Sequence, residues 1–318
     1  MTKSKSTLTL ALTLLLTGAH AQQPQIVQYP LPADVTYPEG IAYDAAAGVV
    51  YTGSAATGIV VRLHLESKKA EVVAPAGSVL PAEPFPALLG QKLDASGRLW
   101  IAGGRTGRIA VIDSRKGTVL KRFETPVEPA GLINDVTLVG SNAYFTDTLR
   151  PRLWRVAVKG DQIGDLEPWL EFAGTPLEYA QGPNLNGITA TADGRHLIVV
   201  QMNKGLLFRI GVVDKHVAAI DTGGEALNTA DGLVLDGRTL YVVRQGEQEI
   251  VTIELSEDLS KGRVLSRFKN PALLWPATAV KVGNQLLVVS TQFNKRNTKD
   301  PQLPFSIVGV PLSMLAAK

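Results

Sequence analysis

The chain has 318 residues and contains no cysteine. It therefore forms no disulfide, offers no thiol nucleophile, and has no cysteine for lipid anchoring near its N-terminus. A large apolar core must hold the fold instead, and the 45% of apolar residues is enough to build one. The 30 glycines and 19 prolines, with few long amphipathic stretches, indicate many short strands and turns.

A long apolar run is also missing. The longest one at the N-terminus, Leu8 to Leu16, has nine residues and is too short to span about 30 Å of hydrocarbon. Lys3 and Lys5 precede it, and Ala19-His20-Ala21 follows. This pattern predicts a secretory signal peptide over residues 1–21, cleaved after Ala21. We expect an exported protein, periplasmic or secreted, whose mature part is one domain over residues 22–318.

The chain carries little excess charge of either sign. Its net charge is +3, and removal of the leader with its two lysines lowers that value to +1. This balance gives no indication of an electrostatic nucleic-acid partner. We expect a monomer that acts on a small molecule, with no nucleic-acid partner and no membrane span.

Several common catalytic motifs are absent as well. The sequence has no Gly-x-Ser-x-Gly elbow, no His-Glu-x-x-His zinc motif and no Gly-rich phosphate loop. Serine-hydrolase, zinc-protease and nucleotide-binding chemistry therefore find no support in the sequence.

What the sequence does contain is a strand–turn–strand unit that occurs six times. Successive units begin 45 to 52 residues apart, and a further strand-like segment follows each of them. They start at Gly40, Gly90, Asp135, Gly187, Gly232 and Thr278. Four short strands per period of this length are typical of a propeller blade. The repeats predict an all-β fold, a six-bladed β-propeller with four-stranded blades; a β-sandwich or two small all-β domains would not produce this spacing.

A closed ring needs one blade shared between the two ends of the chain, because an open ring leaves strand edges exposed. The segments 25–29 and 305–310 both resemble strands. We expect them to meet in the last blade.

The residue before each repeat start should lie at one mouth of the central channel. Read in order, these six residues are Glu39, Leu89, Asn134, Asn186, Asp231 and Ala277. Four of them carry side-chain oxygens, which suits a hard divalent cation such as Ca²⁺, although another divalent cation is possible. The ordinary alternative is that Asn186-Gly187 and Asp231-Gly232 are turn dipeptides. However, their blades already have hairpin turns at Asp193-Gly194 and Asp236-Gly237.

The entrance motifs resemble those of the regucalcin (senescence marker protein)/gluconolactonase-like family of six-bladed propellers. The resemblance covers nearly the whole mature chain and depends on four short motifs in a fixed order, with further support from residues 144–148, which are also similar to strictosidine-synthase-like propellers. These motifs are Pro38-Glu39-Gly40, Ile133-Asn134-Asp135, Leu185-Asn186-Gly187 and Ala230-Asp231-Gly232.

The resemblance implies a calcium-dependent hydrolase of lactones or other esters. Glu39, Asn134, Asn186 and Asp231 would then be the metal ligands, and Asp231 would be the catalytic base or nucleophile. The ion would polarise a carbonyl or phosphoryl oxygen. The alternative is a non-catalytic propeller that the metal stabilises and that binds a small ligand or a protein partner.

Two departures from the family pattern bear on the substrate. Sugar lactonases of the family carry an arginine two residues before the first channel asparagine, where this chain has Leu132. The paraoxonase-like relatives use histidines at the channel mouth, but His64, His196 and His216 stand at no entrance position. The sequence therefore favours neither a sugar lactone nor a histidine-assisted mechanism.

Loops on the entrance side should line a substrate pocket. The candidates from these loops are Arg105, Asp147, Gln201, Asn203, Arg244 and Gln292. The proline-rich stretch 75–86 would be either a lid over the mouth or a spacer between blades.

Overall fold

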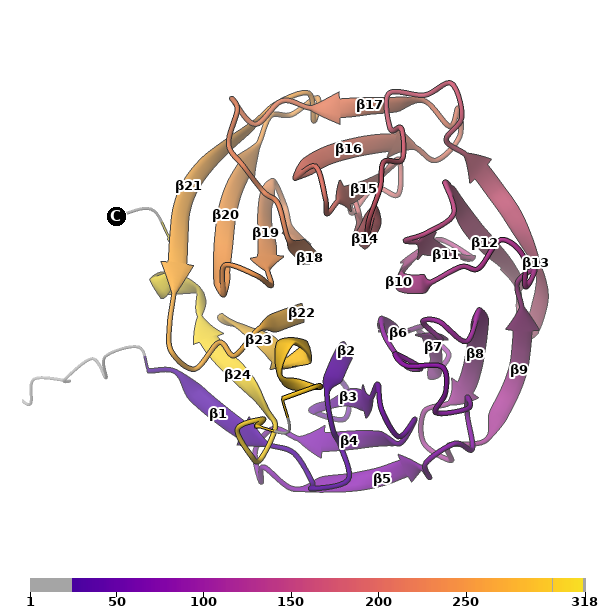
Figure 1. Cartoon of the computed structure of the whole chain (residues 1–318), viewed down its shortest axis with the longest axis vertical. Coiled ribbons are helices and arrows are strands. Elements are labelled where there is room, and N and C mark those ends of the chain that lie inside the picture. The colour runs from indigo at the N-terminus through magenta and orange to yellow at the C-terminus, as the bar shows by residue number, and fades with distance from the viewer. Residues whose placement is uncertain (1–24, 299, 317–318) are drawn as a thin grey trace, which may run out of the picture.

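The computed structural model describes residues 25–298 and 300–316, and its strands form six four-stranded antiparallel sheets arranged as a ring (Figure 1). The predicted six-bladed β-propeller is therefore confirmed. The predicted signal peptide lies outside the described residues. Within the part of the chain that the structure describes, no helix has the length and apolarity of a membrane span.

The first three blades each follow the chain outward from the central axis. Blade 1 contains β2 (Pro38–Asp44), β3 (Val49–Ser54), β4 (Val60–His64) and β5 (Ala70–Ala74). Blade 2 contains β6 (Gln91–Leu93), β7 (Arg98–Ala102), β8 (Arg108–Asp113) and β9 (Val119–Glu124). Blade 3 contains β10 (Ile133–Val139), β11 (Asn142–Asp147), β12 (Arg152–Lys159) and β13 (Gln162–Glu171).

The next two blades repeat this order, and the last one uses both ends of the chain. Blade 4 contains β14 (Leu185–Ala190), β15 (His196–Gln201), β16 (Leu206–Gly211) and β17 (Val217–Ile220). Blade 5 contains β18 (Ala230–Asp236), β19 (Thr239–Arg244), β20 (Glu249–Leu255) and β21 (Gly262–Lys269). Blade 6 contains β22 (Pro276–Val282), β23 (Gln285–Ser290), β24 (Ser306–Pro311) and β1 (Val27–Pro30).

The ring closes as the sequence predicts. Strand β1 pairs antiparallel with β24, with Val27 opposite Gly309 and Pro30 opposite Ser306. This pairing joins the two ends of the chain in one sheet and leaves no open seam between blades 6 and 1. Two short 3₁₀-helices, η1 (Phe293–Lys295) and η2 (Leu312–Met314), flank β24 in sequence.

The apolar core lies between the blades. Buried aliphatic and aromatic side chains form a separate cluster at each of the six contacts between neighbouring blades. Trp100, for example, is fully buried between blades 2 and 3, and its indole nitrogen donates to Asp94 at 2.9 Å. Successive side chains of a strand point to opposite faces of its sheet, so an unbroken apolar run supplies apolar residues to both faces. Both faces can then pack against neighbouring blades, and the six sheets stack around the axis.

The first strand of each blade lies nearest the axis, and these inner strands contact one another around the ring (Figure 1). In five blades the inner strand begins with a register shift typical of a β-bulge, at Pro38/Ile41, Ile133/Val136, Leu185/Ile188, Ala230/Leu233 and Pro276/Ala279. A bulge re-aims side chains. The entrance residues of these five blades stand at the bulges, so the same local feature orients their side chains.

Candidate metal centre at the channel entrance

The structure places the four predicted metal ligands at the starts of inner strands in blades 1, 3, 4 and 5. Glu39, Asn134, Asn186 and Asp231 are 2%, 7%, 5% and 3% exposed, respectively. Each has one side-chain oxygen that is buried and has no hydrogen-bond partner: Glu39 Oε2, Asn134 Oδ1, Asn186 Oδ1 and Asp231 Oδ1. A buried acceptor without a partner costs about 1–3 kcal/mol, so four at equivalent positions require an explanation. A bound cation would supply one.

The glycine after the entrance residue is needed for packing, not for a turn. Asn186-Gly187 lies inside β14, and a Cβ added to Gly187 would stand 2.2 Å from the carbonyl oxygen of Asp231 in the next blade. Gly40 meets the carbonyl oxygen of Leu89 in the same way, at 2.1 Å. Glycine thus lets neighbouring inner strands approach, and the turn interpretation of these dipeptides does not hold.

Direct hydrogen bonds complete the contacts between neighbouring entrances. Gly90 N donates to the carbonyl oxygen of Asn134 at 2.9 Å, and Thr278 Oγ1 donates to the carbonyl oxygen of Glu39. Thr146 Oγ1 donates to the carbonyl oxygen of Asn186 at 2.7 Å. Backbone fixed in this way holds the donors in place before any ligand arrives.

The amide of Asn134 is oriented by Thr148. The Thr148 hydroxyl donates to the carbonyl oxygen of Leu185 at 2.6 Å, so it can only accept from Asn134 Nδ2, which lies 2.9 Å away. This arrangement places the amide nitrogen of Asn134 against Thr148 and leaves Oδ1 free. Asn186 Nδ2 lies 3.4 Å from Met202 Sδ, which likewise leaves Asn186 Oδ1 unpaired.

One oxygen of Asp231 is fixed by Gln245. Gln245 Nε2 donates to Asp231 Oδ2 at 2.7 Å, so Oδ1 remains free. Burial and the carboxylate of Asp135 raise the pKa of Asp231 to about 8, while the Asn186 side chain lowers it. Burial, then Asp231 and Asp135, hold the pKa of Glu39 well above its ordinary value. A cation bound among these carboxylates would attract them and offset their mutual repulsion, and it would therefore favour their ionised forms.

Asp135 is a third buried carboxylate, which the sequence analysis named only as a repeat start. Its Oδ1 accepts from Val136 N at 2.8 Å, and its Oδ2 accepts from Ile188 N at 3.1 Å, so it connects blade 3 to blade 4. Burial raises the pKa of Asp135, and Lys92 opposes that effect. The sequence does contain a sign that Asp135 is special, because it occupies the repeat position at which four other blades have glycine.

The donor set differs from a cage of carboxylates and histidines. Among residues 25–298 and 300–316, no group of three His, Asp or Glu side chains is arranged to hold a metal ion. The entrance offers two carboxylates and two amides instead. Oxygen donors of this mixed kind suit Ca²⁺. The four unpaired oxygens therefore fit the predicted ion by their chemistry.

Asp147, a predicted pocket residue, is fully buried and supports the entrance from behind. Its Oδ2 pairs with Arg150 Nε at 2.5 Å and accepts from Trp154 Nε1 at 3.1 Å. Its Oδ1 accepts from the backbone nitrogen of Leu132 at 3.1 Å. Asp147 thus holds two segments at the entrance. One is the segment before Asn134, through the backbone of Leu132, and the other is its own segment, which continues into Thr148.

The amide residues of blade 4 hold the loop that leads into β14. Asn184 Oδ1 accepts from Gln201 Nε2 at 2.9 Å and from Asn203 Nδ2 at 3.2 Å. Gln201 Oε1 and Asn203 Oδ1 stay buried without partners. Gln292 has a similar local role, because it exchanges hydrogen bonds with the backbone of Gln302 across the loop after β23. Arg105 is exposed.

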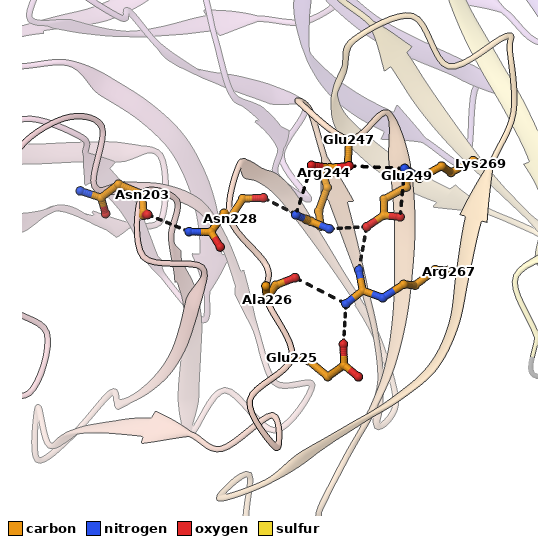
Figure 2. Close-up of polar contacts among 9 residues, drawn as sticks. All are labelled: Asn203, Glu225, Ala226, Asn228, Arg244, Glu247, Glu249, Arg267 and Lys269. Carbon is orange, nitrogen blue, oxygen red and sulfur yellow. Dashed lines mark hydrogen bonds and ion pairs between the residues drawn. The ribbon is translucent and has the colours of Figure 1, made fainter.

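Arg244 belongs to an ionic network in blade 5 (Figure 2). Its guanidinium pairs with Glu249 and donates to the carbonyl oxygen of Asn228 at 2.9 Å. Glu249 also accepts from Arg267, whose second nitrogen pairs with Glu225 at 2.7 Å. The guanidinium of Arg244 is therefore engaged by the protein. The network ties residues 225–228 to β19–β21 and supports Asp231 and Gln245, which follow Asn228 and Arg244 in sequence.

The fold and this ring of donors define a six-bladed propeller with an oxygen-rich site at one mouth of its channel. No protein-family model and no curated protein sequence matches the chain. Solved structures do match. A calcium-binding regucalcin from Agrobacterium tumefaciens aligns with a TM-score of 0.64 and 18% identity over 90% of this chain and 95% of its own.

Two further solved structures align with most of the chain. A gluconolactonase from Xanthomonas campestris aligns with a TM-score of 0.65 and 15% identity, over 91% of this chain and 89% of its own. A catalytically inactive virginiamycin B lyase from Staphylococcus aureus aligns with a TM-score of 0.59 and 15% identity, over 91% and 89% of the two chains. At these identities, the likeness establishes the six-bladed fold.

Proposed function

We propose that the protein binds one calcium ion at the entrance ring and hydrolyses a lactone or another ester there. The observation that carries this proposal is the set of four buried, unpaired oxygens on Glu39, Asn134, Asn186 and Asp231. Structural similarity to a gluconolactonase and to a calcium-binding regucalcin supports it. When bound, the ion would polarise the carbonyl or phosphoryl oxygen of the substrate.

The chain supplies the proton transfer through Asp231. Gln245 holds Oδ2 at 2.7 Å, so the carboxylate keeps one orientation while Oδ1 faces the site. As a general base, Asp231 takes a proton from water; the water oxygen bonds to the acyl carbon, and the ester C–O bond breaks. The proton then passes to the leaving alkoxide. As a nucleophile, Asp231 would instead bond to the acyl carbon while the ester C–O bond breaks and the alkoxide leaves. Water would then hydrolyse the resulting anhydride, releasing the acid and supplying the proton that the alkoxide takes up.

Isotope labelling separates these two routes. In a single turnover in ¹⁸O-labelled water, the general-base route places the label in the product acid. On the nucleophilic route, water attack at the Asp231 carboxyl carbon of the acyl–enzyme anhydride leaves the first product unlabelled and places ¹⁸O in the Asp231 carboxylate. Mass spectrometry of the peptide detects this label, and its presence identifies the nucleophilic route. Asp231→Asn abolishes turnover in both cases.

The experiment that tests the function is a screen of lactones and aryl esters with metal-stripped and calcium-loaded protein. Calcium-dependent turnover that Asp231→Asn abolishes supports the proposal. Full activity after complete chelation, or in Asp231→Asn, overturns it.

A second candidate is a non-catalytic propeller in which the metal ties the blades together. The low exposure of the four donors, 2–7%, and their origin in four different blades favour this role. It predicts that metal removal lowers the melting temperature while no substrate of the screen turns over. We also propose that residues 1–21 direct export, which N-terminal sequencing of the exported protein tests.

A further inference from the structure

The entrance ring has an apolar arc between two of its donors. Leu89, the entrance residue of blade 2, is 3% exposed. Its carbonyl oxygen packs against Gly40, next to Glu39, and the following residue, Gly90, donates to the carbonyl oxygen of Asn134. Leu89 therefore stands between Glu39 and Asn134 around the ring. The side chain of Leu89 cannot coordinate a cation, but it could contact an apolar part of a ligand.

Leu89 belongs to a compact group of apolar side chains, which we term the apolar wall. The wall consists of Ala55, Leu89 and Leu132, with Phe85 and Phe293 packed against them. The rings of Phe85 and Phe293 are 5.3 Å apart at 68°, an edge-to-face contact. The short helix η1, which contains Phe293, lies beside β2 on the inner side of the ring (Figure 1). The wall thus adjoins the entrances of blades 1 and 2.

The wall keeps a surface that a ligand can contact. Phe85 and Phe293 are only half-buried. The Arg296 guanidinium lies 3.7 Å from the centroid of the Phe85 ring and within 4.0 Å of Glu83. This cation–π contact fixes the aromatic ring in place. A rigid, half-exposed aromatic surface beside an ion site is suited to hold an apolar group.

The side of the entrance formed by blade 4 has the opposite character. It contains the buried amides of Asn184 and Gln201 and the amide of Asn203, and Gln201 and Asn203 each keep a buried, unpaired oxygen. A polyhydroxylated ligand spread across the mouth would leave hydroxyl groups against Leu89, Leu132 and Phe293 without hydrogen-bond partners, which is costly. An alkyl or aryl group would bury apolar surface there instead.

We propose that the apolar wall binds an alkyl or aryl substituent of the substrate, which makes the substrate a hydrophobic lactone or ester. This inference rests on the proposed function, since it places the reacting ester over the ring. Leu132, which stands where sugar lactonases have an arginine, is part of the wall.

The turnover test compares γ-lactones whose alkyl substituent grows from methyl to hexyl, together with glucono-δ-lactone, on calcium-loaded protein. We expect kcat/KM to rise about two- to fourfold per added methylene, mainly through KM, and to be lowest for the sugar lactone. Phe293→Ala flattens this series. Val127→Ala keeps it, because Val127 is an apolar side chain that is 83% exposed and outside the wall.

A binding test with the matching alkyl γ-lactams, which resist hydrolysis, works without turnover. Calorimetry should show affinity that rises with chain length in the wild type and in Val127→Ala, but not in Phe293→Ala. Binding of this kind without turnover overturns the hydrolase and supports the wall. Turnover that does not depend on chain length overturns the wall and supports the hydrolase. A flat lactam series, or no lactam binding, also overturns the wall.

Discussion

Removal of the metal is expected to make the protein less stable as the pH rises. Burial raises the pKa values of Glu39, Asp135 and Asp231 above their ordinary values, and neighbouring carboxylates add to this effect at Glu39 and at Asp231, whose pKa rises to about 8. In metal-free folded protein these groups therefore hold protons that the unfolded chain has already released. The contribution of Asp231 is fully present below its ordinary pKa of 3.8 and is lost as the pH rises to about 8.

The magnitude follows from the number of protons involved. Each group that is protonated only in the folded state lowers the free energy of unfolding by at most about 1.4 kcal/mol per pH unit. Asp231 alone could thus remove about 3 kcal/mol between pH 5 and pH 7. Calcium binding requires the ionised carboxylates and releases their protons, so its affinity should increase with pH. Calcium should therefore stabilise the protein most at pH 8.

Urea unfolding of metal-stripped protein at pH 5, 6, 7 and 8, with and without 1 mM calcium, measures both effects. Asp231→Asn removes one titrating group and should show a flatter pH dependence without metal than the wild type. Metal-stripped protein that is as stable at pH 8 as at pH 5, with no added stability from calcium at either pH, would refute this reasoning.

Four substitutions test separate parts of the site. Asp231→Asn should lower kcat/KM by at least about 100-fold while the circular dichroism spectrum stays that of the wild type. Thr148→Val removes the partner of the Asn134 amide nitrogen and should weaken calcium binding about 10- to 100-fold by calorimetry, whereas an unchanged affinity would show that this contact does not orient the donor. Glu249→Gln leaves buried Arg244 without its carboxylate and should lower the free energy of unfolding by about 3 kcal/mol in urea. Gly187→Ala forces a Cβ toward the carbonyl oxygen of Asp231 and should lower both the melting temperature and the calcium affinity; a stable variant that binds calcium normally would contradict the packing argument.

The fold could be predicted because the evidence for it is local and repeated. Each blade contains its own hairpin signals, such as Asp193-Gly194 and Asp236-Gly237, and both glycines have the positive φ that such turns require. The pairing that closes the ring could also be predicted, because the sequences of β1 and β24 both have a strand pattern. The positions of the four entrance oxygens follow from the same repeats.

The neighbours of the entrance residues could not be predicted, because they come from other strands and loops, some of them in other blades. Gly187 looks like half of a turn until the carbonyl oxygen of Asp231 is placed 2.2 Å from its missing Cβ. The sequence makes Arg244 a candidate pocket residue, but in the structure Glu249 and the carbonyl oxygen of Asn228 occupy its guanidinium. Spacing along one strand contains no information about such contacts between loops and neighbouring strands.

Calorimetric titration of calcium into metal-stripped protein tests the central claim most directly. The entrance ring predicts one ion per chain for the wild type and for Glu66→Gln, which changes an exposed carboxylate in the turn between β4 and β5, at the other end of blade 1. Glu39→Gln, which removes one of the two ring carboxylates, should weaken binding at least about tenfold. Wild-type protein that binds no calcium, or Glu39→Gln that binds it as tightly as the wild type, would contradict the account.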